Sequence, residues 1–133
     1  MKVVNKVLKD SGLFLLHTIG TDTSLKSTDP WINKYIFPNG MLPSPYYIAK
    51  SVEGIFKIED WHNFGVDYDK TLIEWFKNFD KYWKNKFGKE NKFYRMWKYY
   101  LLSCAGAFRA RNIHVWQIVF SKNGVLGGYN SIR

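Results

Sequence analysis

The chain has 133 residues, which suits a single domain, and we expect one unit over residues 1–133. A formal net charge of +9 favours an anionic partner, and a 19% aromatic content is more than a core of this size easily hides. A single cysteine, Cys104, excludes an internal disulfide. Because Cys104 falls within an apolar helical pattern, we expect it to be a buried packing residue. No apolar run approaches the roughly 20 residues that a membrane span needs, and we expect no signal peptide, because charged residues interrupt the first ten positions.

The first elements predicted are a helix and a buried strand. Residues 1–10 place apolar side chains on one helical face, namely Val3, Val4, Val7 and Leu8. Residues 13–16 are four large apolar residues in a row, which predicts a strand buried on both faces. His17 follows at the carboxyl end of this strand, where open α/β sheets bind ligands. The alternative for His17 is a packed side chain that bonds to a backbone carbonyl.

Residues 29–40 form an aromatic segment between two prolines that ends in Asn-Gly. This composition excludes a long regular element, and we interpret the segment as the wall of an apolar pocket. Residues 41–52 then predict a short helix, with Ser44 as cap and Pro45 at the first position. Its predicted inward residues are Tyr47, Ile48 and Val52.

The second half of the chain predicts two helices between two strands. Ile55 to Ile58 read as a short strand, and a helix running on from Lys70 ends at Gly88. A further helix begins near Asn91. Ile113 to Phe120 are apolar on both sides and predict an internal strand. The fold class is therefore α/β, with a small sheet that is incomplete.

Several longer motifs in this chain occur together and in a fixed order. They are residues 12–20, residues 29–40 with 42–44 after them, residues 59–65 with Tyr68, residues 95–101 and residues 104–109. With these motifs the chain resembles one known family, the cyclopropane-fatty-acyl-phospholipid synthases, which use S-adenosylmethionine. The resemblance covers the chain essentially end to end and corresponds to the C-terminal part of the family.

The resemblance implies the C-terminal portion of a class I methyltransferase fold, which is Rossmann-like and has seven strands. Leu13–His17 would be its fifth strand, and Ile55–Asp60 with Ile113–Phe120 its final antiparallel pair. The family transfers a methyl from S-adenosylmethionine to a cis double bond of a phospholipid acyl chain. Bound bicarbonate then removes a proton from the resulting carbocation, and the ring closes.

The resemblance also implies site residues. The bicarbonate site would consist of the His17 side chain, the Ile19 backbone and the Tyr68 hydroxyl. These donor types suit an anion in an apolar cavity, although Tyr68 could equally keep its hydroxyl in water. Tyr35 and Phe37 would stabilise the carbocation or line the acyl pocket through their ring faces, or else simply pack.

The chain also departs from the family pattern. The Gly-rich turn and the ribose-binding acid of the cofactor half are not found, so no S-adenosylmethionine-binding residue is expected here. A cysteine and a glutamate of the family site would lie ahead of Met1. We therefore expect the chain alone to be inactive, and to work with a separate N-terminal half or as a homo-oligomer. Residues Glu59, Asp60 and His62 have weak metal spacing, so we expect a structural role and no metal.

The alternative function is a non-catalytic basic module that binds an anionic membrane surface. From Lys70 to Lys98 nine Lys or Arg stand against three acidic residues, a local net of +6 (nine minus three). Lysines beside aromatic residues suit a phospholipid surface. No nucleic-acid motif occurs, so we expect no nucleic-acid partner. The expected location is cytoplasmic, at the inner face of the membrane.

Overall fold

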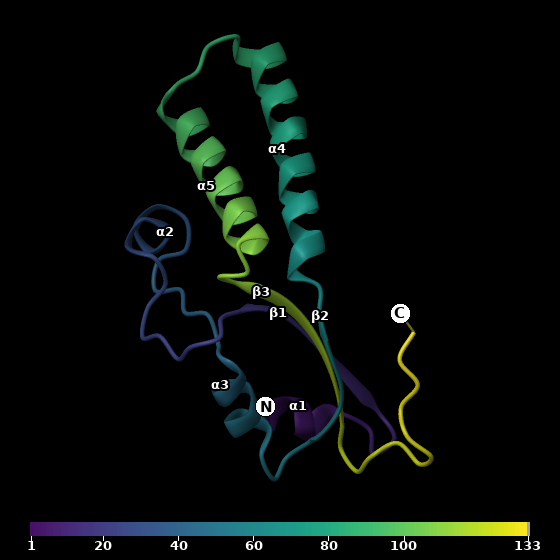
Figure 1. Cartoon of the computed structure of the whole chain (residues 1–133). Helices are drawn as coiled ribbons and strands as arrows, with labels where there is room; N and C mark the ends of the chain where they lie inside the picture. Colours follow the sequence, from purple (N-terminus) through teal and green to yellow (C-terminus); the bar gives the residue numbers. More distant parts are fainter. Residues whose placement is uncertain (133) are drawn as a thin grey trace. The chain divides into compact units, whose positions relative to one another are not determined.

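The computed structural model describes residues 1–132, with the element order α1, β1, α2, α3, β2, α4, α5, β3 (Figure 1). The chain divides into two compact units. Unit 1 comprises Met1–Leu25, Leu42–Asn63 and the residues from Val115 onward, and unit 2 comprises Lys26–Met41 and Phe64–His114.

The three strands form one sheet. β1 (Leu13–Gly20), β2 (Lys57–Asn63) and β3 (His114–Ser121) lie in the order β1-β3-β2 (Figure 1). β2 and β3 pair antiparallel, from Lys57 opposite Ser121 to Asn63 opposite Trp116. The predicted final antiparallel pair is thus confirmed. β2 begins later than predicted, because Gly54 (φ +67°) turns the chain after α3.

β3 is the internal strand, as predicted, and its two neighbours cover both of its edges. Val115, Ile118 and Phe120 have 0% exposure. On one face, Ile118 and Phe120 pack with Ile48 and Val52 of α3 (Pro45–Val52) in the core of unit 1. A strand that is buried on both faces therefore organises this core.

β1 differs from its prediction of burial on both faces. Leu13 and Leu15 are 46% and 54% exposed, whereas Phe14 and Leu16 pack against the core of unit 1. The reason is that β1 is an edge strand of this sheet, so its alternate side chains have different surroundings. An all-apolar run does not by itself distinguish an edge from an interior strand.

The helices of unit 1 confirm one prediction and shorten another. Ser44 caps α3 by accepting a hydrogen bond from the Tyr47 N–H (3.4 Å), and Pro45 is its first residue. Tyr47 itself is 36% exposed rather than inward. α1 (Lys2–Val7) is shorter than residues 1–10, and Val3 and Val7 of its predicted apolar face are exposed.

Unit 2 contains the remaining helices. The aromatic segment includes a short helix that the sequence did not predict, α2 (Pro30–Tyr35), because the Asp29 carboxylate accepts from the N–H groups of Trp31 and Ile32 (2.9 and 3.0 Å). α4 (Gly65–Phe87) and α5 (Lys92–Arg109) form a helical hairpin (Figure 1). Gly88, with φ +66°, ends α4, and α5 begins after Asn91, as predicted. The Asn91 side chain also caps α5, because it accepts a hydrogen bond from the Tyr94 N–H (3.0 Å).

Two polar contacts join the helices of this hairpin. The Arg109 guanidinium donates to both carboxylate oxygens of Asp69 (2.9 and 3.0 Å). The Tyr94 hydroxyl, in a residue only 1% exposed, donates to Asp80 (2.6 Å). These contacts fix the register of α4 against α5 at two separate levels, which apolar packing alone would leave adjustable.

We predict that Gly20→Ala destabilises the chain by about 2 kcal/mol. A Cβ at Gly20 would lie inside the indole ring of Trp116, which is 3% exposed and has no room to move. Gly106→Ala on α5 is the matched control, because nothing lies within 4 Å of its added Cβ. It should stabilise the chain by about 0.5–1 kcal/mol through helix propensity. Urea unfolding measures both, and an unchanged midpoint for Gly20→Ala would contradict the packing described.

We predict that the contribution of Tyr94 to stability fades between pH 10 and pH 12. The hydrogen bond to ionised Asp80, followed by burial, raises the pKa of Tyr94 from 10.0 to about 12. The unfolded chain therefore loses this proton first, so the stabilisation is complete below pH 10 and is lost as pH rises through the folded pKa. The difference in unfolding free energy between the wild type and Tyr94→Phe should shrink over this range. A difference that stays constant would show that Tyr94 is not tied to Asp80.

Candidate functional site

The predicted residues of unit 1 lie on the face of β1 that does not pack against the core. His17 and Ile19 are alternate residues of one strand, so they share a face with the exposed Leu13 and Leu15. The Nδ1 atom of His17 is 3.4 Å from the amide nitrogen of Gln117 in β3. His17 is thus held from the neighbouring strand, and this face combines an imidazole with apolar side chains.

Tyr68 belongs to unit 2 and lies in the first turns of α4. Its half-buried ring packs edge-on against Phe108 of α5 (5.2 Å between centroids) and against Trp75 (5.8 Å). The helix begins at Gly65, before the predicted start, which places Tyr68 inside the helix rather than ahead of it. The phenol is therefore carried by a rigid element.

Tyr100 lies between two of the predicted residues, because its ring contacts Phe37 and it interacts electrostatically with Tyr68. We call these three residues, with Trp97 and Phe108, the aromatic cluster. The ring of Tyr100 packs edge-on against Phe37 (5.9 Å between ring centroids) and against Trp97, one turn earlier on α5 (5.5 Å). Burial, then the nearby Cys104 thiol and Tyr68, raise the pKa of Tyr100. The sequence alone assigned no role to Tyr100. The feature that could have pointed to it is a hydroxyl on the otherwise apolar face of α5.

Tyr35 has different partners from Phe37. Its ring lies 5.4 Å from Trp31, which in turn packs edge-on against Tyr99 of α5 (4.5 Å). Tyr35 is 44% exposed, and Lys34 places its ammonium 5.2 Å from the ring centre. Residues 29–40 thus present two aromatic contacts to α5, one through Trp31 and one through Phe37.

The remaining candidate groups have structural roles. Glu59 accepts hydrogen bonds from the Ser121 hydroxyl and from the Val125 N–H (3.1 Å), which confirms a structural role for this carboxylate. Cys104 is half-buried, and burial followed by the charge of Asp29 raises the pKa of its thiol, so the nucleophilic thiolate is disfavoured. Among residues 1–132, no group of three or more His, Cys, Asp or Glu is placed to hold a metal ion.

Two connections from a strand to a helix can be compared with the turn that binds a nucleotide in Rossmann-like folds. β1 leads through residues 21–29 into the short helix α2, and β2 leads through Phe64 directly into α4. Neither connection is the glycine-rich strand-to-helix turn that brings backbone N–H groups to a nucleotide. No helix within residues 1–132 has both the length and the apolar character to cross a membrane.

The sequence profile described as "Mycolic acid cyclopropane synthetase" matches residues 1–118. The chain belongs to this family. The cyclopropane-fatty-acyl-phospholipid synthase of Escherichia coli K12 is 54% identical over 132 residues, which are 98% of this chain and 34% of that protein. The sphingolipid C9-methyltransferase A of Emericella nidulans is 32% identical over 90% of this chain and 25% of its own length. The chain therefore spans about a third or less of these relatives' lengths.

Solved structures show the same fold. The cyclopropane synthase MmaA2 of Mycobacterium tuberculosis matches 90% of this chain and 47% of its own, with a TM-score of 0.77 and 24% identity. The mycolic acid cyclopropane synthase CmaA1, solved with SAH and CTAB, matches 88% of this chain and 46% of its own, with a TM-score of 0.75 and 25% identity. The predicted fold class, part of a Rossmann-like methyltransferase, is confirmed.

Proposed function

We propose that this chain is the C-terminal portion of an S-adenosylmethionine-dependent cyclopropane-fatty-acyl-phospholipid synthase, which acts in lipid biosynthesis. The observation that carries the proposal is the 54% identity to the E. coli synthase over 98% of the chain. The reaction converts a cis double bond of a phospholipid acyl chain into a cyclopropane. Since the chain corresponds to 34% of that relative, we propose that it is inactive alone and requires the cofactor-binding part, in the same polypeptide or in trans.

In this proposal, His17, the Ile19 backbone N–H and Tyr68 hold a bicarbonate ion. An anion in an apolar setting needs directed donors, and imidazole, amide and phenol supply them. His17 and Ile19 share one face of β1, and Gln117 restrains the His17 ring. Tyr68 lies near the N-terminus of α4, where the positive end of the helix dipole favours negative charge. These features support an anion site without a bulky cation.

The aromatic cluster has a complementary role in the proposal. The face of an aromatic ring is negative and attracts a cationic centre within about 6 Å. Phe37 and Tyr100 supply such rings beside Tyr68, and Tyr35 supplies another with 44% exposure. We infer that these side chains contact the acyl chain and stabilise positive charge at the former double bond, while water is kept out.

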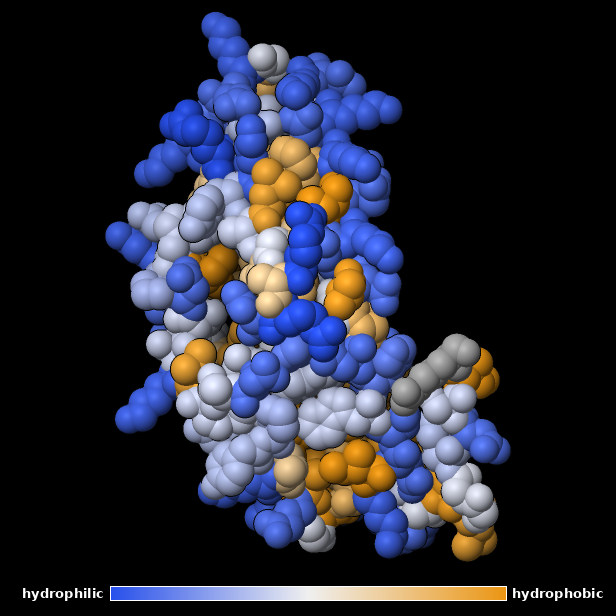
Figure 2. Space-filling model, viewed as in Figure 1, coloured by the Kyte–Doolittle hydropathy of each residue, from blue (hydrophilic) through white to orange (hydrophobic). Residues whose placement is uncertain are grey.

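The proposed location is the cytoplasm, peripheral to the inner face of the membrane. Figure 2 shows mainly hydrophilic residues around the end of the hairpin where α4 ends and α5 begins. Several lysines lie there, among them Lys84, Lys86, Lys89 and Lys92. Each exposed cation near an anionic leaflet contributes about 1 kcal/mol. A cofactor-binding half or a second copy of the chain would cover Leu13 and Leu15 on the edge strand.

The proposal is tested with a chimera, in which the part of the E. coli synthase that this chain does not match precedes Met1. We expect the purified chimera to transfer labelled methyl groups from S-adenosylmethionine to phospholipid vesicles that contain cis-unsaturated acyl chains. Vesicles with saturated chains are the control substrate. A folded chimera that binds S-adenosylmethionine yet modifies no lipid would refute the proposed function.

We predict that Tyr68→Phe in this chimera lowers kcat by roughly 10²-fold, the usual cost of removing one donor to a catalytic anion. The matched control is Tyr82→Phe, since Tyr82 lies on the same helix, is 57% exposed, and accepts only a surface contact from Lys86 (2.9 Å). Its kcat should not change. If both variants retain full activity, Tyr68 is a packing residue only.

A further inference from the structure

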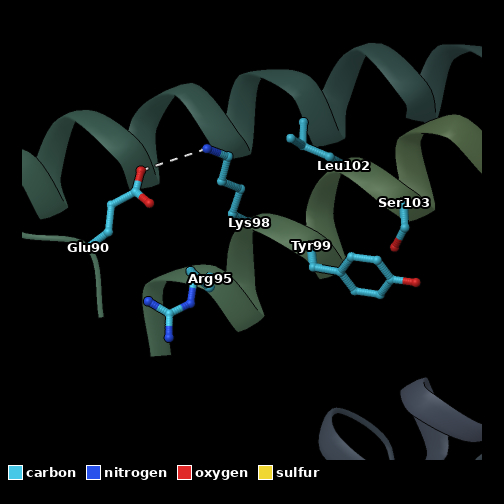
Figure 3. A pocket seen from close by; sticks show the side chains of 6 residues that line it. All are labelled: Glu90, Arg95, Lys98, Tyr99, Leu102 and Ser103. Atoms are coloured by element: carbon cyan, nitrogen blue, oxygen red, sulfur yellow. Dashed lines mark ion pairs between the residues drawn. The ribbon is translucent and has the colours of Figure 1, made fainter. Parts of the chain in front are cut away.

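A cleft in unit 2 lies along α5 and the turn that precedes it (Figure 3). Its side chains combine basic, aromatic, apolar and hydroxyl groups, and they are Glu90, Arg95, Lys98, Tyr99, Leu102 and Ser103. All but Glu90 recur at helical spacings from Arg95 (i+3, i+4, i+7 and i+8), so they form one stripe of the helix. Of these residues, Tyr99 was named above as the ring that contacts Trp31, and none of them was a predicted site residue.

The charges of this cleft are only partly compensated. Lys98 reaches toward Glu90, at 3.8 Å between nitrogen and oxygen (Figure 3). Its ammonium lies 5.6 Å from the centre of the Tyr94 ring. Within residues 1–132, Arg95 makes no ion pair and no side-chain hydrogen bond. The cleft therefore keeps a full positive charge on a planar group with five N–H donors.

The hydroxyl groups differ in what they can offer. Ser103 donates to the backbone carbonyl of Tyr100 (3.2 Å), so its proton is in use. The Tyr99 side chain is 55% exposed, and its hydroxyl has no hydrogen-bond partner among the described residues. Figure 3 shows Arg95 and Tyr99 on the same side of α5. Together they present the guanidinium and a phenol to one ligand, a pairing that suits phosphate oxygens.

The surroundings of these donors are apolar and aromatic. Leu102 is half-buried in the cleft, and the Tyr99 ring packs against Trp31 (4.5 Å). Tyrosine and tryptophan beside basic side chains are typical of membrane–water interfaces, where one end of the ring is apolar and the other is hydrated. A ligand for this cleft should thus carry a phosphate next to an apolar part.

We propose that this cleft binds the phosphodiester of an anionic phospholipid, with the phosphate at Arg95 and Tyr99 and the glycerol end of the acyl chains against Leu102 and the Trp31–Tyr99 pair. This inference rests on the proposed function in one respect only, because it takes the ligand to be the lipid on which the enzyme acts. The uncompensated positive charge of Arg95, next to aromatic and apolar side chains, favours a phospholipid over free phosphate or nucleic acid as the ligand.

The test is a binding titration of short-chain phosphatidylglycerol, kept below its critical micelle concentration, into the full chain and into the chimera. Arg95→Gln should weaken binding about tenfold, since it removes a charge-assisted, two-point contact. Lys81→Gln is the matched control, because Lys81 is also exposed, carries the same charge, lies on α4 and does not line the cleft. It should change the affinity by less than about twofold. Circular dichroism confirms that both variants fold.

Three other ligands distinguish the sources of phosphate. Short-chain phosphatidylcholine should bind several-fold more weakly than phosphatidylglycerol, and inorganic phosphate should not compete at equal concentration. Equal losses in Arg95→Gln and Lys81→Gln would overturn the proposal in favour of diffuse surface charge. Binding of inorganic phosphate or of an oligothymidine would also overturn the proposal, if it depended on Arg95 and were as tight as the binding of the lipid. The absence of lipid binding would overturn it as well.

Methyl transfer by the chimera is measured separately, so the two proposals fail independently. A chimera that modifies lipid while Arg95→Gln binds phosphatidylglycerol normally refutes only the headgroup site. A chimera that binds phosphatidylglycerol through Arg95 but transfers no methyl refutes only the proposed function.

Discussion

The constraint on which unit 1 depends is that β3 is buried on both faces. Water must be excluded from both sides of this strand, and its edges are occupied by β1 and β2. On one face, Trp116, Ile118 and Phe120 pack with side chains from α1, α3 and β1. β1 is then free to carry a polar residue on its other face, and His17 lies there beside Gln117. The buried strand thus supplies the rigidity, and the edge strand carries the imidazole of His17.

Local sequence signals predicted where the helices begin and end, but they did not predict how far each strand is buried. Ser44, Gly88 and Asn91 act on backbone groups within a few residues, so their roles could be read without knowledge of the fold. The burial of residues 13–16 could not be read from the sequence, because it depends on whether the strand has one neighbouring strand or two. The α2 helix was missed because the two prolines outweighed the capping signal of Asp29 followed by Pro30.

The site was predictable only in part, for a similar reason. The family resemblance named His17, Ile19 and Tyr68, and the bicarbonate role of all three stays a prediction. Tyr100 carried no signal apart from its hydroxyl, because its importance comes from packing: residues 29–40 must fold onto α5 before Phe37 meets this ring. Sequence spacing places residues on the face of a helix, but it does not show which distant segment covers that face.

The basic charge of the hairpin illustrates the difference between attraction and recognition. Lys70, Lys77 and Lys84 each pair with a carboxylate one turn away on α4. The local net of +6 already subtracts the carboxylates that pair with Lys77 and Lys84, and the positive charge that remains belongs to the other basic side chains. What remains draws the hairpin toward an anionic surface over about 8 Å at physiological ionic strength, without regard to orientation. Orientation requires a cation whose charge is uncompensated and that lies among apolar and hydrogen-bonding groups. Arg95 satisfies this condition, because it is uncompensated and lies beside the exposed aromatic Tyr99 and the half-buried Leu102.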